Sequence, residues 1–344
     1  MSPSGLGWII VDSLDTLMIM NLTMRLSDAR KWLHRGLTYN QGQGVNTFTM
    51  TIRMLGGLLS AHYLSNVLPD VSSRRDYVYL SRAVDVADRL LGAYGSTSGI
   101  SYASVNVGTR EGLPSHADGG ASSTAEATTL QLEMKYLAHL TGKVDGLLPI
   151  FVHPDTGHFR SKEIRLGSRG DSYYEYLIKQ YFQTSGQEPV YREMCEKALS
   201  GIQKHLVTST KHSKPQFIAE LPHGIAGPLS PKMDHPVCFL PGSIAIGATE
   251  GLTEKEARNM PGWNSQKEQQ MQLARELMKT CWTVYAVTAS GISPEIAWFE
   301  IDEVSSWEQD LNIKPLDAHN LQRPETVESL FWMYRVTNDP IYRK

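Results

Sequence analysis

Apolar residues recur along much of the chain with the spacing of an amphipathic helix. Leu80, Val84, Ala87 and Leu91 fall on one helical face, and Gly92 follows as a residue that commonly ends helices. The same spacing recurs in three later segments, Leu130–Thr141, Tyr174–Tyr181 and Val327–Tyr334. These patterns predict helices and an all-α fold.

Other parts of the chain show weaker helical patterns. We expect helices over Thr49–Leu64, Val190–Leu206 and Gln266–Val287. Only Phe217–Leu221 suggests a strand. The loops rich in Gly, Ser and Pro are too short to be interdomain linkers, so residues 1–344 are interpreted as a single domain of helical hairpins.

Composition and charge exclude several classes of protein. The 344 residues include Lys+Arg 33 and Asp+Glu 36, and this net charge of −3 argues against a nucleic-acid partner. Apolar residues at 41% and charged residues at 20% exclude a disordered chain. The apolar stretch Trp8–Leu22 contains Asp12 and Asp15, so we do not expect it to span a membrane, and no signal-peptide pattern opens the sequence. The sequence has no recognisable zinc, nucleotide-binding or serine-hydrolase motif.

Three carboxylates share one place, the first turn of a predicted helix: Glu126, Asp171 and Glu325. Each has a structural explanation, because Ser123 and Glu126 form a capping-box pattern, Asp171 is a good N-cap, and Glu325 suits the positive end of a helix dipole. Alternatively, a closed helical barrel would bring helix N-termini to one rim, where two carboxyl groups can act as general acid and general base on a glycosidic bond. The residues alone leave both interpretations open.

Further charged residues accompany two of these acids. Arg169 and Arg323 each stand two residues before an acid, and Glu175 and Glu328 lie about one helical turn after it. They could tune the acids and hold a ligand, or form ordinary exposed ion pairs.

Two other polar groups stand beside apolar residues. Asp12 and Asp15 could cap or link helices, or could bind a ligand. Asp234 and His235 form another cluster, in which a lone histidine more often has a structural role.

Seven ordered blocks of sequence resemble the class I α-1,2-mannosidases of glycoside hydrolase family 47. The blocks are Ile10–Leu17, Thr51–Ala61, Ser122–Glu126, Arg169–Tyr176, Lys232–His235 with Cys238–Gly242, Ser293–Ile296 and Arg323–Leu330. The resemblance implies an (α/α)7 barrel and calcium-dependent, inverting hydrolysis of terminal α-1,2-linked mannose from high-mannose N-glycans. It also implies a monomer in the ER or Golgi lumen, or a secreted one.

The resemblance assigns roles to individual residues. Glu126 matches the general acid, acting directly or through water, Glu325 matches the general base, and Asp171 matches a third catalytic carboxylate. An inverting mechanism predicts acid and base carboxyls about 6.5–9.5 Å apart, with room for water. The positions that resemble sugar-contacting residues are Arg169, Glu175, Asp234, His235, Glu295, Arg323 and Glu328.

The three cysteines also find a place in the resemblance. Cys238 and Cys281 match the disulfide pair of the classical processing enzymes, which their degradation-enhancing relatives are expected to lack. Cys195 is then left as a free thiol.

The sequence departs from the family pattern at its ends and at two internal positions. The family domain extends beyond both ends, and the Phe-Asn-Thr-Glu block, whose threonine ligates calcium, has no counterpart here, so no metal ligand is assigned. We expect apolar side chains such as Phe331 and Tyr334 to be exposed at an unclosed seam. Thr49 replaces a usual Glu, which would weaken a carboxylate cluster, and Asn21 replaces a common Gly, creating the glycosylation acceptor triplet Asn21-Leu22-Thr23. These departures leave a second hypothesis, a non-catalytic lectin-like or adaptor protein of glycoprotein quality control.

Overall fold

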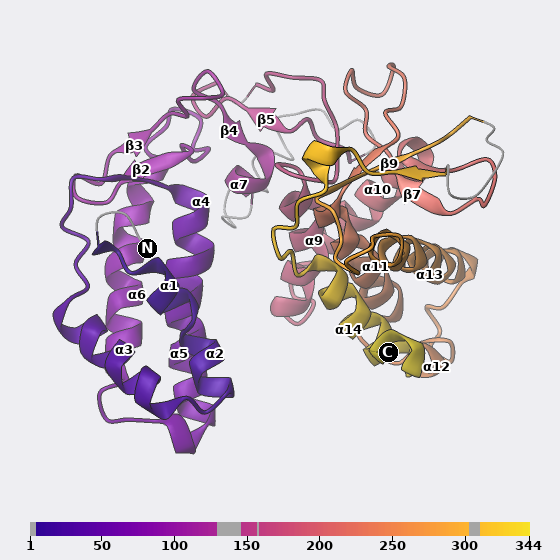
Figure 1. The fold of residues 1–344 in the computed structure, drawn as a ribbon. Helices are drawn as coiled ribbons and strands as arrows, with labels where there is room; N and C mark the ends of the chain where they lie inside the picture. Colours follow the sequence, from indigo (N-terminus) through magenta and orange to yellow (C-terminus); the bar gives the residue numbers. More distant parts are fainter. Residues whose placement is uncertain (1–4, 129–145, 157, 303–309) are drawn as a thin grey trace. The chain divides into compact units, whose positions relative to one another are not determined.

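The computed structural model describes residues 5–128, 146–156, 158–302 and 310–344 (Figure 1). The chain divides into two compact units. Unit 1 comprises residues 1–141 and 151–160, and unit 2 comprises residues 142–150 and 161–344.

Unit 1 is built from helices that pack around one apolar core (Figure 1). Its α-helices are α1 (Trp8–Asp12), α2 (Leu14–Ile19), α3 (Thr23–Arg35), α4 (Thr47–Thr49), α5 (Gly56–Val67), α6 (Tyr77–Leu90) and α7 (Thr124–Thr128). A π-helical segment, Met50–Leu55, joins α4 to α5, and 3-10 turns cover Pro69–Val71 and Leu91–Tyr94. Gly57 lets α5 approach α1, because a Cβ there would lie 2.8 Å from the Val11 carbonyl oxygen.

Unit 1 also contains short strands. β1 (Gly44–Asn46), β2 (Ser104–Asn106) and β3 (Gly112–Leu113) form an antiparallel sheet in that order, with Val45 opposite Val105. β4 (Ser122–Ser123) pairs with β5 (Phe151–Val152), directly before α7.

Unit 2 has longer helices. They are α9 (Asp171–Gln183), α10 (Pro189–His205), α11 (Leu240–Thr249), α12 (Glu254–Ala257), α13 (Ser265–Ala286) and α14 (Glu325–Thr337). The 3-10 turns are His235–Phe239, Pro315–Asp317 and Pro340–Arg343. Helix α11 is buried along almost its whole length against α13 and α14, because its residues are apolar or small.

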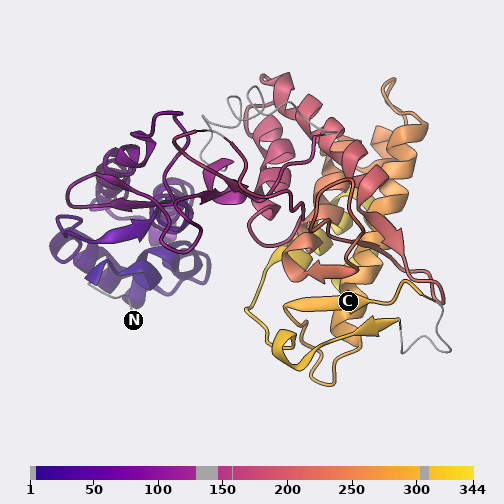
Figure 2. The same cartoon turned by 90° about the horizontal axis from the view of Figure 1, so that it is seen from above.

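The strands of unit 2 are also short. β8 (Lys232–Asp234), β9 (Ile296–Phe299) and β10 (Leu311–Asn312) make an antiparallel sheet with β9 in the middle, and β6 (Val207–Ser209) pairs with β7 (Gln216–Ile218). Figure 1 shows β7 and β9 above α11, α13 and α14, and Figure 2 gives the view from above. The sheet matters for the site, because β8 leads directly into His235.

The structure confirms most predicted helices but corrects which faces are buried. On α6, Leu80, Val84 and Leu91 are 44%, 53% and 62% exposed. The buried stripe of this region is instead Val78, Tyr79, Ala83, Val86 and Leu90. Both faces of α6 are apolar, so periodicity alone could not decide between them.

The same correction applies to α14. Val327 and Phe331 are 63% and 54% exposed, whereas Thr326, Ser329, Met333 and Val336 are buried. Small Ser329 lets the helix approach α11 closely: the Gly242 backbone N–H donates to Ser329 Oγ at 2.9 Å. The predicted exposure of Phe331 is confirmed, and Tyr334 is half-buried.

Several details of the helix ends and strands also differ from expectation. Asp171 is the first residue of α9 and Gly170 is its N-cap; Pro324 is likewise the N-cap of α14. Sequence patterns missed every strand except β7, because segments of two to four residues are too short to show alternation. The helix predicted over residues 130–141 lies outside the described residues.

Candidate active site

The N-termini of α9 and α14 place two of the predicted carboxylates in one electrostatic cluster of unit 2. Asp171 is the first residue of α9 and Glu325 the first of α14 (Figure 1). Burial, helped by the neighbouring charges of Glu175 and Glu325, raises the pKa of Asp171 to about 7. The Asp171 carboxylate also accepts the Ser172 backbone N–H at 2.8 Å, which partly opposes the shift. Asp171 is therefore partly protonated near neutral pH.

Glu325 has a similar environment. Burial raises its pKa, the Arg323 charge lowers it, and Glu175 and Glu295 raise it. Its Oε2 atom is buried and has no hydrogen-bond partner among the described residues. A buried carboxylate oxygen without a partner is costly, so this atom is suited to bind something that the protein itself does not supply.

Arg323 supports the cluster through Glu295. The Arg323 Nε donates to Glu295 Oε1 at 2.8 Å, and Nη2 donates to the same oxygen. The Glu295 side chain is only 8% exposed, and its Oε2 atom is buried without a partner in the described part of the chain. The predicted residues Arg323 and Glu295 are thus joined, with one oxygen left to accept a ligand hydroxyl.

Lys179 links the other two predicted acids. Its ammonium group pairs with Glu175, one turn earlier on α9, and with Glu328 of α14 at 2.6 Å. The two glutamates are 15% and 28% exposed, so this is a partly buried, three-membered network. Sequence analysis did not select Lys179, although its i,i+4 spacing from Glu175 was a signal.

His235 is held in a neutral form beside this cluster. Its Nε2 lies 3.0 Å from Thr326 Oγ1 and 3.3 Å from the Tyr285 hydroxyl. Burial, opposed by the Glu295 charge and helped by the Arg323 charge, lowers the pKa of His235 to about 4. Tyr285 and Thr326 were not predicted, because no local pattern connects them to position 235.

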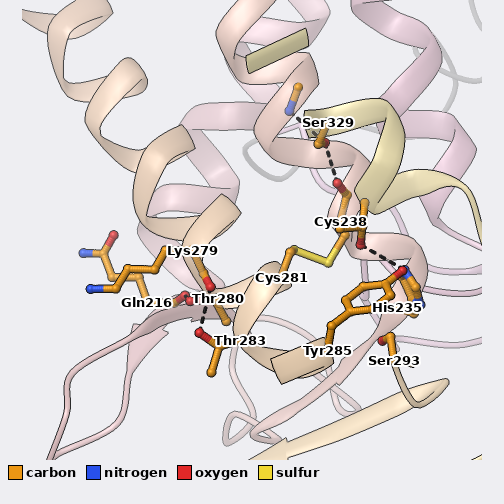
Figure 3. The surroundings of a disulfide bond; sticks show 12 residues. Gln216, His235, Cys238, Lys279, Thr280, Cys281, Thr283, Tyr285, Ser293 and Ser329 are labelled. Carbon is orange, nitrogen blue, oxygen red and sulfur yellow. Dashed lines mark hydrogen bonds between the residues drawn. A yellow bond between two sulfur atoms is a disulfide. The ribbon is translucent and has the colours of Figure 1, made fainter. Parts of the chain in front are cut away.

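The predicted disulfide fixes this side of the site. Cys238 and Cys281 are bonded, with Cα atoms 5.9 Å apart, and Cys195 is free. Figure 3 shows the bridge joining the turn that holds His235 to the helix that holds Tyr285. Ser329 of α14 donates to the Cys238 carbonyl oxygen, so three segments meet here.

Asp234 has a role that the sequence did not indicate. It is 3% exposed, it pairs with Lys232 at 2.7 Å, and its Oδ2 accepts the Ser168 backbone N–H at 3.2 Å. Lys232 also pairs with Glu220, whose pKa burial and the Asp234 charge raise to about 6. Asp234 therefore contacts the backbone of the loop that leads into Asp171.

That loop is tightly constrained. A Cβ at Gly167 would lie 2.5 Å from Asp234 Oδ2, and a Cβ at Gly170 would lie 2.2 Å from the Arg165 carbonyl oxygen, so both positions require glycine. Arg165 Nε donates to the Ser168 carbonyl oxygen at 2.8 Å. Arg169 is exposed and has a left-handed φ of +74°, a conformation that costs about 1–3 kcal/mol outside glycine.

Glu126 lies in unit 1. It is in the first turn of α7, where its Oε1 accepts from Asn46 Nδ2 at 3.1 Å and its backbone N–H donates to Ser123 Oγ at 3.2 Å. The second of these bonds is one half of the predicted capping box. Asn46 also accepts from the backbone N–H and the hydroxyl of Thr49, so Thr49 supports the residue that contacts Glu126.

Asp12 and Asp15 have interhelical roles. Asp12 pairs with Arg53 at 2.8 Å with both side chains about half exposed, and Asp15 accepts from the Ser60 hydroxyl at 3.2 Å. These acids were expected either to cap or link helices or to bind a ligand, and the structure shows contacts between helical segments.

The described residues form neither a metal-binding cluster of acidic, His or Cys side chains nor a membrane-spanning helix. No group of three or more His, Cys, Asp or Glu side chains in the described part of the chain is arranged to hold a metal ion. Among the same residues, no helix combines the length and apolar character needed to cross a membrane.

These features define the class: an all-α protein with carboxylates gathered at helix N-termini. Its fold is similar to that of the α-1,2-mannosidase from Trichoderma reesei, with a TM-score of 0.79 and 22% identity over 98% of this chain and 74% of that one. At that identity the likeness shows the fold alone, and it confirms the predicted fold class, that of the (α/α)7 barrels.

The sequence comparisons give the family. The profile of glycosyl hydrolase family 47 matches residues 1–145 and 142–344, and the chain therefore belongs to that family. A mannosyl-oligosaccharide 1,2-alpha-mannosidase of Candida albicans is 52% identical over 100% of this chain and 62% of its own length. The endoplasmic reticulum enzyme of Saccharomyces cerevisiae is 44% identical over 98% of this chain and 68% of its own length. The chain thus spans 62% and 68% of the lengths of these two curated relatives.

Proposed function

We propose that this chain provides the acidic centre of an α-1,2-mannosidase that removes terminal mannose from high-mannose N-glycans. The observation that supports this most is the buried cluster around Asp171 and Glu325, in which burial raises the pKa of both carboxyls. Relatives in the family are named mannosyl-oligosaccharide 1,2-alpha-mannosidases. Because hydrolysis of a glycosidic bond needs one carboxyl that holds a proton and one that accepts a proton, a tuned acidic cluster fits the reaction.

In the proposed reaction Glu325 acts as the general base. Its Oε2, which has no hydrogen-bond partner among the described residues, takes a proton from a water, whose oxygen forms a bond to the anomeric carbon of mannose. The bond from that carbon to the leaving oxygen breaks, and an acid donates a proton to this oxygen. Attack by water from the opposite face yields mannose of inverted configuration.

Two residues are proposed as the acid that donates a proton to the leaving oxygen. Glu126 has this role by its motif, directly or through water. The pKa of Asp171, raised by burial to about 7, lets it hold a proton near neutral pH and supports it as an alternative donor. The separation of about 6.5–9.5 Å between acid and base stays a prediction.

The remaining residues are proposed to bind the sugar. Glu295 Oε2, which lacks a described partner, can accept a sugar hydroxyl, while Arg323 keeps that carboxylate ionised and in place. Glu175 and Glu328, neutralised in part by Lys179, offer further acceptors. Neutral His235 can exchange hydrogen bonds with a neutral ligand without adding charge.

We also propose that turnover requires calcium, as the family resemblance implies. No group of described acidic, His or Cys side chains forms a site for the ion, so no residue is assigned as a ligand and no step above depends on it. Chelation should abolish mannose release, and added calcium should restore it.

The proposed setting is the lumen of the secretory pathway, where the protein acts as a monomer. The disulfide is consistent with an oxidising compartment, and the yeast relative is named for the endoplasmic reticulum.

The test is to incubate the purified chain with a high-mannose glycan and calcium, and to follow released mannose and its anomeric form by NMR. We expect β-mannose as the first product. Glycan binding without release would favour the lectin-like alternative, and neither binding nor release by a folded chain would contradict both hypotheses.

A further inference from the structure

A turn joins α2 to α3 in unit 1 (Figure 1). It contains a residue with a left-handed backbone and several exposed apolar side chains. Asn21 has a left-handed φ of +52°. Its backbone N–H donates to the Met18 carbonyl oxygen at 3.0 Å, and the Leu22 N–H donates to the Leu17 carbonyl oxygen at 2.8 Å. These two bonds form a Schellman motif, in which the left-handed position favours glycine and, after it, asparagine.

The Asn21 side chain has no structural task in this turn. It is exposed, and its amide makes no hydrogen bond to any described residue. The backbone bonds alone close the turn, so they explain why the position needs a left-handed residue and not why that residue is asparagine. Leu22 and Thr23 are exposed as well, so the whole acceptor triplet Asn21-Leu22-Thr23 is accessible. It is also the only Asn-X-Ser/Thr triplet in the 344 residues.

The surface around Asn21 is apolar. Within three residues of it stand four exposed apolar side chains: Ile19 at 70%, Met20 at 62%, Leu22 at 42% and Met24 at 82% exposed. Several large apolar side chains exposed within one short segment often indicate that something covers them. The acceptor triplet lies in the middle of this apolar turn.

We propose that Asn21 is an N-glycosylation site and that its glycan covers the apolar turn. In this reaction the Asn21 side-chain nitrogen bonds to the anomeric carbon of an oligosaccharide carried on a lipid pyrophosphate. The bond from that carbon to the pyrophosphate oxygen breaks, the lipid pyrophosphate leaves with the electron pair, and the amide nitrogen loses one proton. The hydrated glycan then covers apolar side chains that would otherwise be exposed to bulk water. The proposal rests on the secretory location proposed above, and it does not depend on catalysis.

The modification is tested by secreting the chain from a yeast host behind a cleavable leader and identifying the peptide that contains residue 21 by mass spectrometry. We expect a glycan on wild type and on Thr23→Ser, which keeps the triplet. We expect none on Thr23→Ala, or on Asn21→Gly, which keeps a residue suited to the left-handed turn. The proposed site would be overturned if the peptide that contains residue 21 were wholly unmodified in a secreted chain whose Cys238–Cys281 bridge has formed.

The formed bridge shows that the chain passed through the oxidising compartment, so this result would not reflect a failure of delivery. The mass readout likewise separates the glycan from mannosidase activity: an inactive chain with a glycan on Asn21 supports the site and contradicts only the proposed reaction.

The covering role is tested by removing the glycan enzymatically from the native protein and measuring the binding of a hydrophobic dye. Dye binding should rise on wild type. It should not rise on a variant in which Ile19→Ser, Met20→Ser, Leu22→Ser and Met24→Ser are combined, because this variant keeps the acceptor triplet and lacks the apolar turn. An equal change in both proteins would overturn the covering role.

Discussion

Acidic side chains at opposite ends of helices have different surroundings in the two units: Asp12 ends α1, whereas Asp171 begins α9 and Glu325 begins α14. In unit 1, Asp12 pairs with Arg53 where both are about half exposed. In unit 2, Asp171 is a buried first-turn residue whose pKa is raised to about 7, and Glu325 keeps one buried oxygen without a described partner. Exposed pairs contribute little to stability, whereas buried carboxyls change their protonation. The difference teaches that burial and neighbouring charges decide which of these acids has a raised pKa.

Replacement of Glu325 should have the largest effect. Glu325→Gln keeps the shape but removes the proposed base, so kcat for mannose release should fall by about 10²–10⁴-fold with little change in melting temperature. Glu196→Gln, at an exposed partner of Arg192 on α10, is the control and should keep full activity. Full activity of the Glu325 variant would show that Glu325 is not the general base, and the proposed difference between the acids of the two units would then fail.

The pH dependence of stability should show the buried state of Asp171. Because its pKa is about 7 when folded and near the ordinary 3.8 when unfolded, the folded state binds more protons between these values. The free energy of unfolding should therefore fall as pH rises from about 4 to 7, by up to about 4 kcal/mol. Asp171→Asn should lose this component, as measured by urea unfolding at several pH values. Identical pH slopes in both proteins would contradict the buried pKa.

Asp234 should matter for stability more than an exposed acid does. Asp234→Ala leaves the Ser168 N–H without its acceptor and weakens the pairing of partly buried Lys232, so we expect a loss of about 2–3 kcal/mol. The matched control is Asp28→Ala, whose pair with Lys31 is largely exposed and should contribute less than about 0.5 kcal/mol. Equal losses in the two variants would show that Asp234 does not hold the loop.

The smallest effect is expected at Asp12 and Arg53. A double-mutant cycle with Asp12→Ala and Arg53→Ala should give a coupling of about 0.2–1 kcal/mol, because water screens this half-exposed pair. Measurement at low and high salt should show the coupling weaken with salt. A coupling above about 2 kcal/mol would place this pair with the buried networks of unit 2.

Much of the fold was predictable where one local pattern dominated. Helices α9, α10 and α13 begin and end within a few residues of their predicted bounds. The Cys238–Cys281 bridge, implied by resemblance, is confirmed. The buried face of α6 is not the one that its apolar spacing indicated, because this helix has apolar residues on more than one side and the neighbour decides which side packs.

The site divides in the same way. The sequence by itself determined the residue types at helix N-termini, the glycines before Asp171 and the i,i+4 spacing of Glu175 and Lys179. Only the tertiary structure decided that Lys179 also pairs with Glu328, that Tyr285 and Thr326 contact His235, and that Asp234 contacts the Ser168 loop. The reason is physical: helix propensity and capping act over a few residues, whereas desolvation and ion pairing depend on groups brought together from distant parts of the chain.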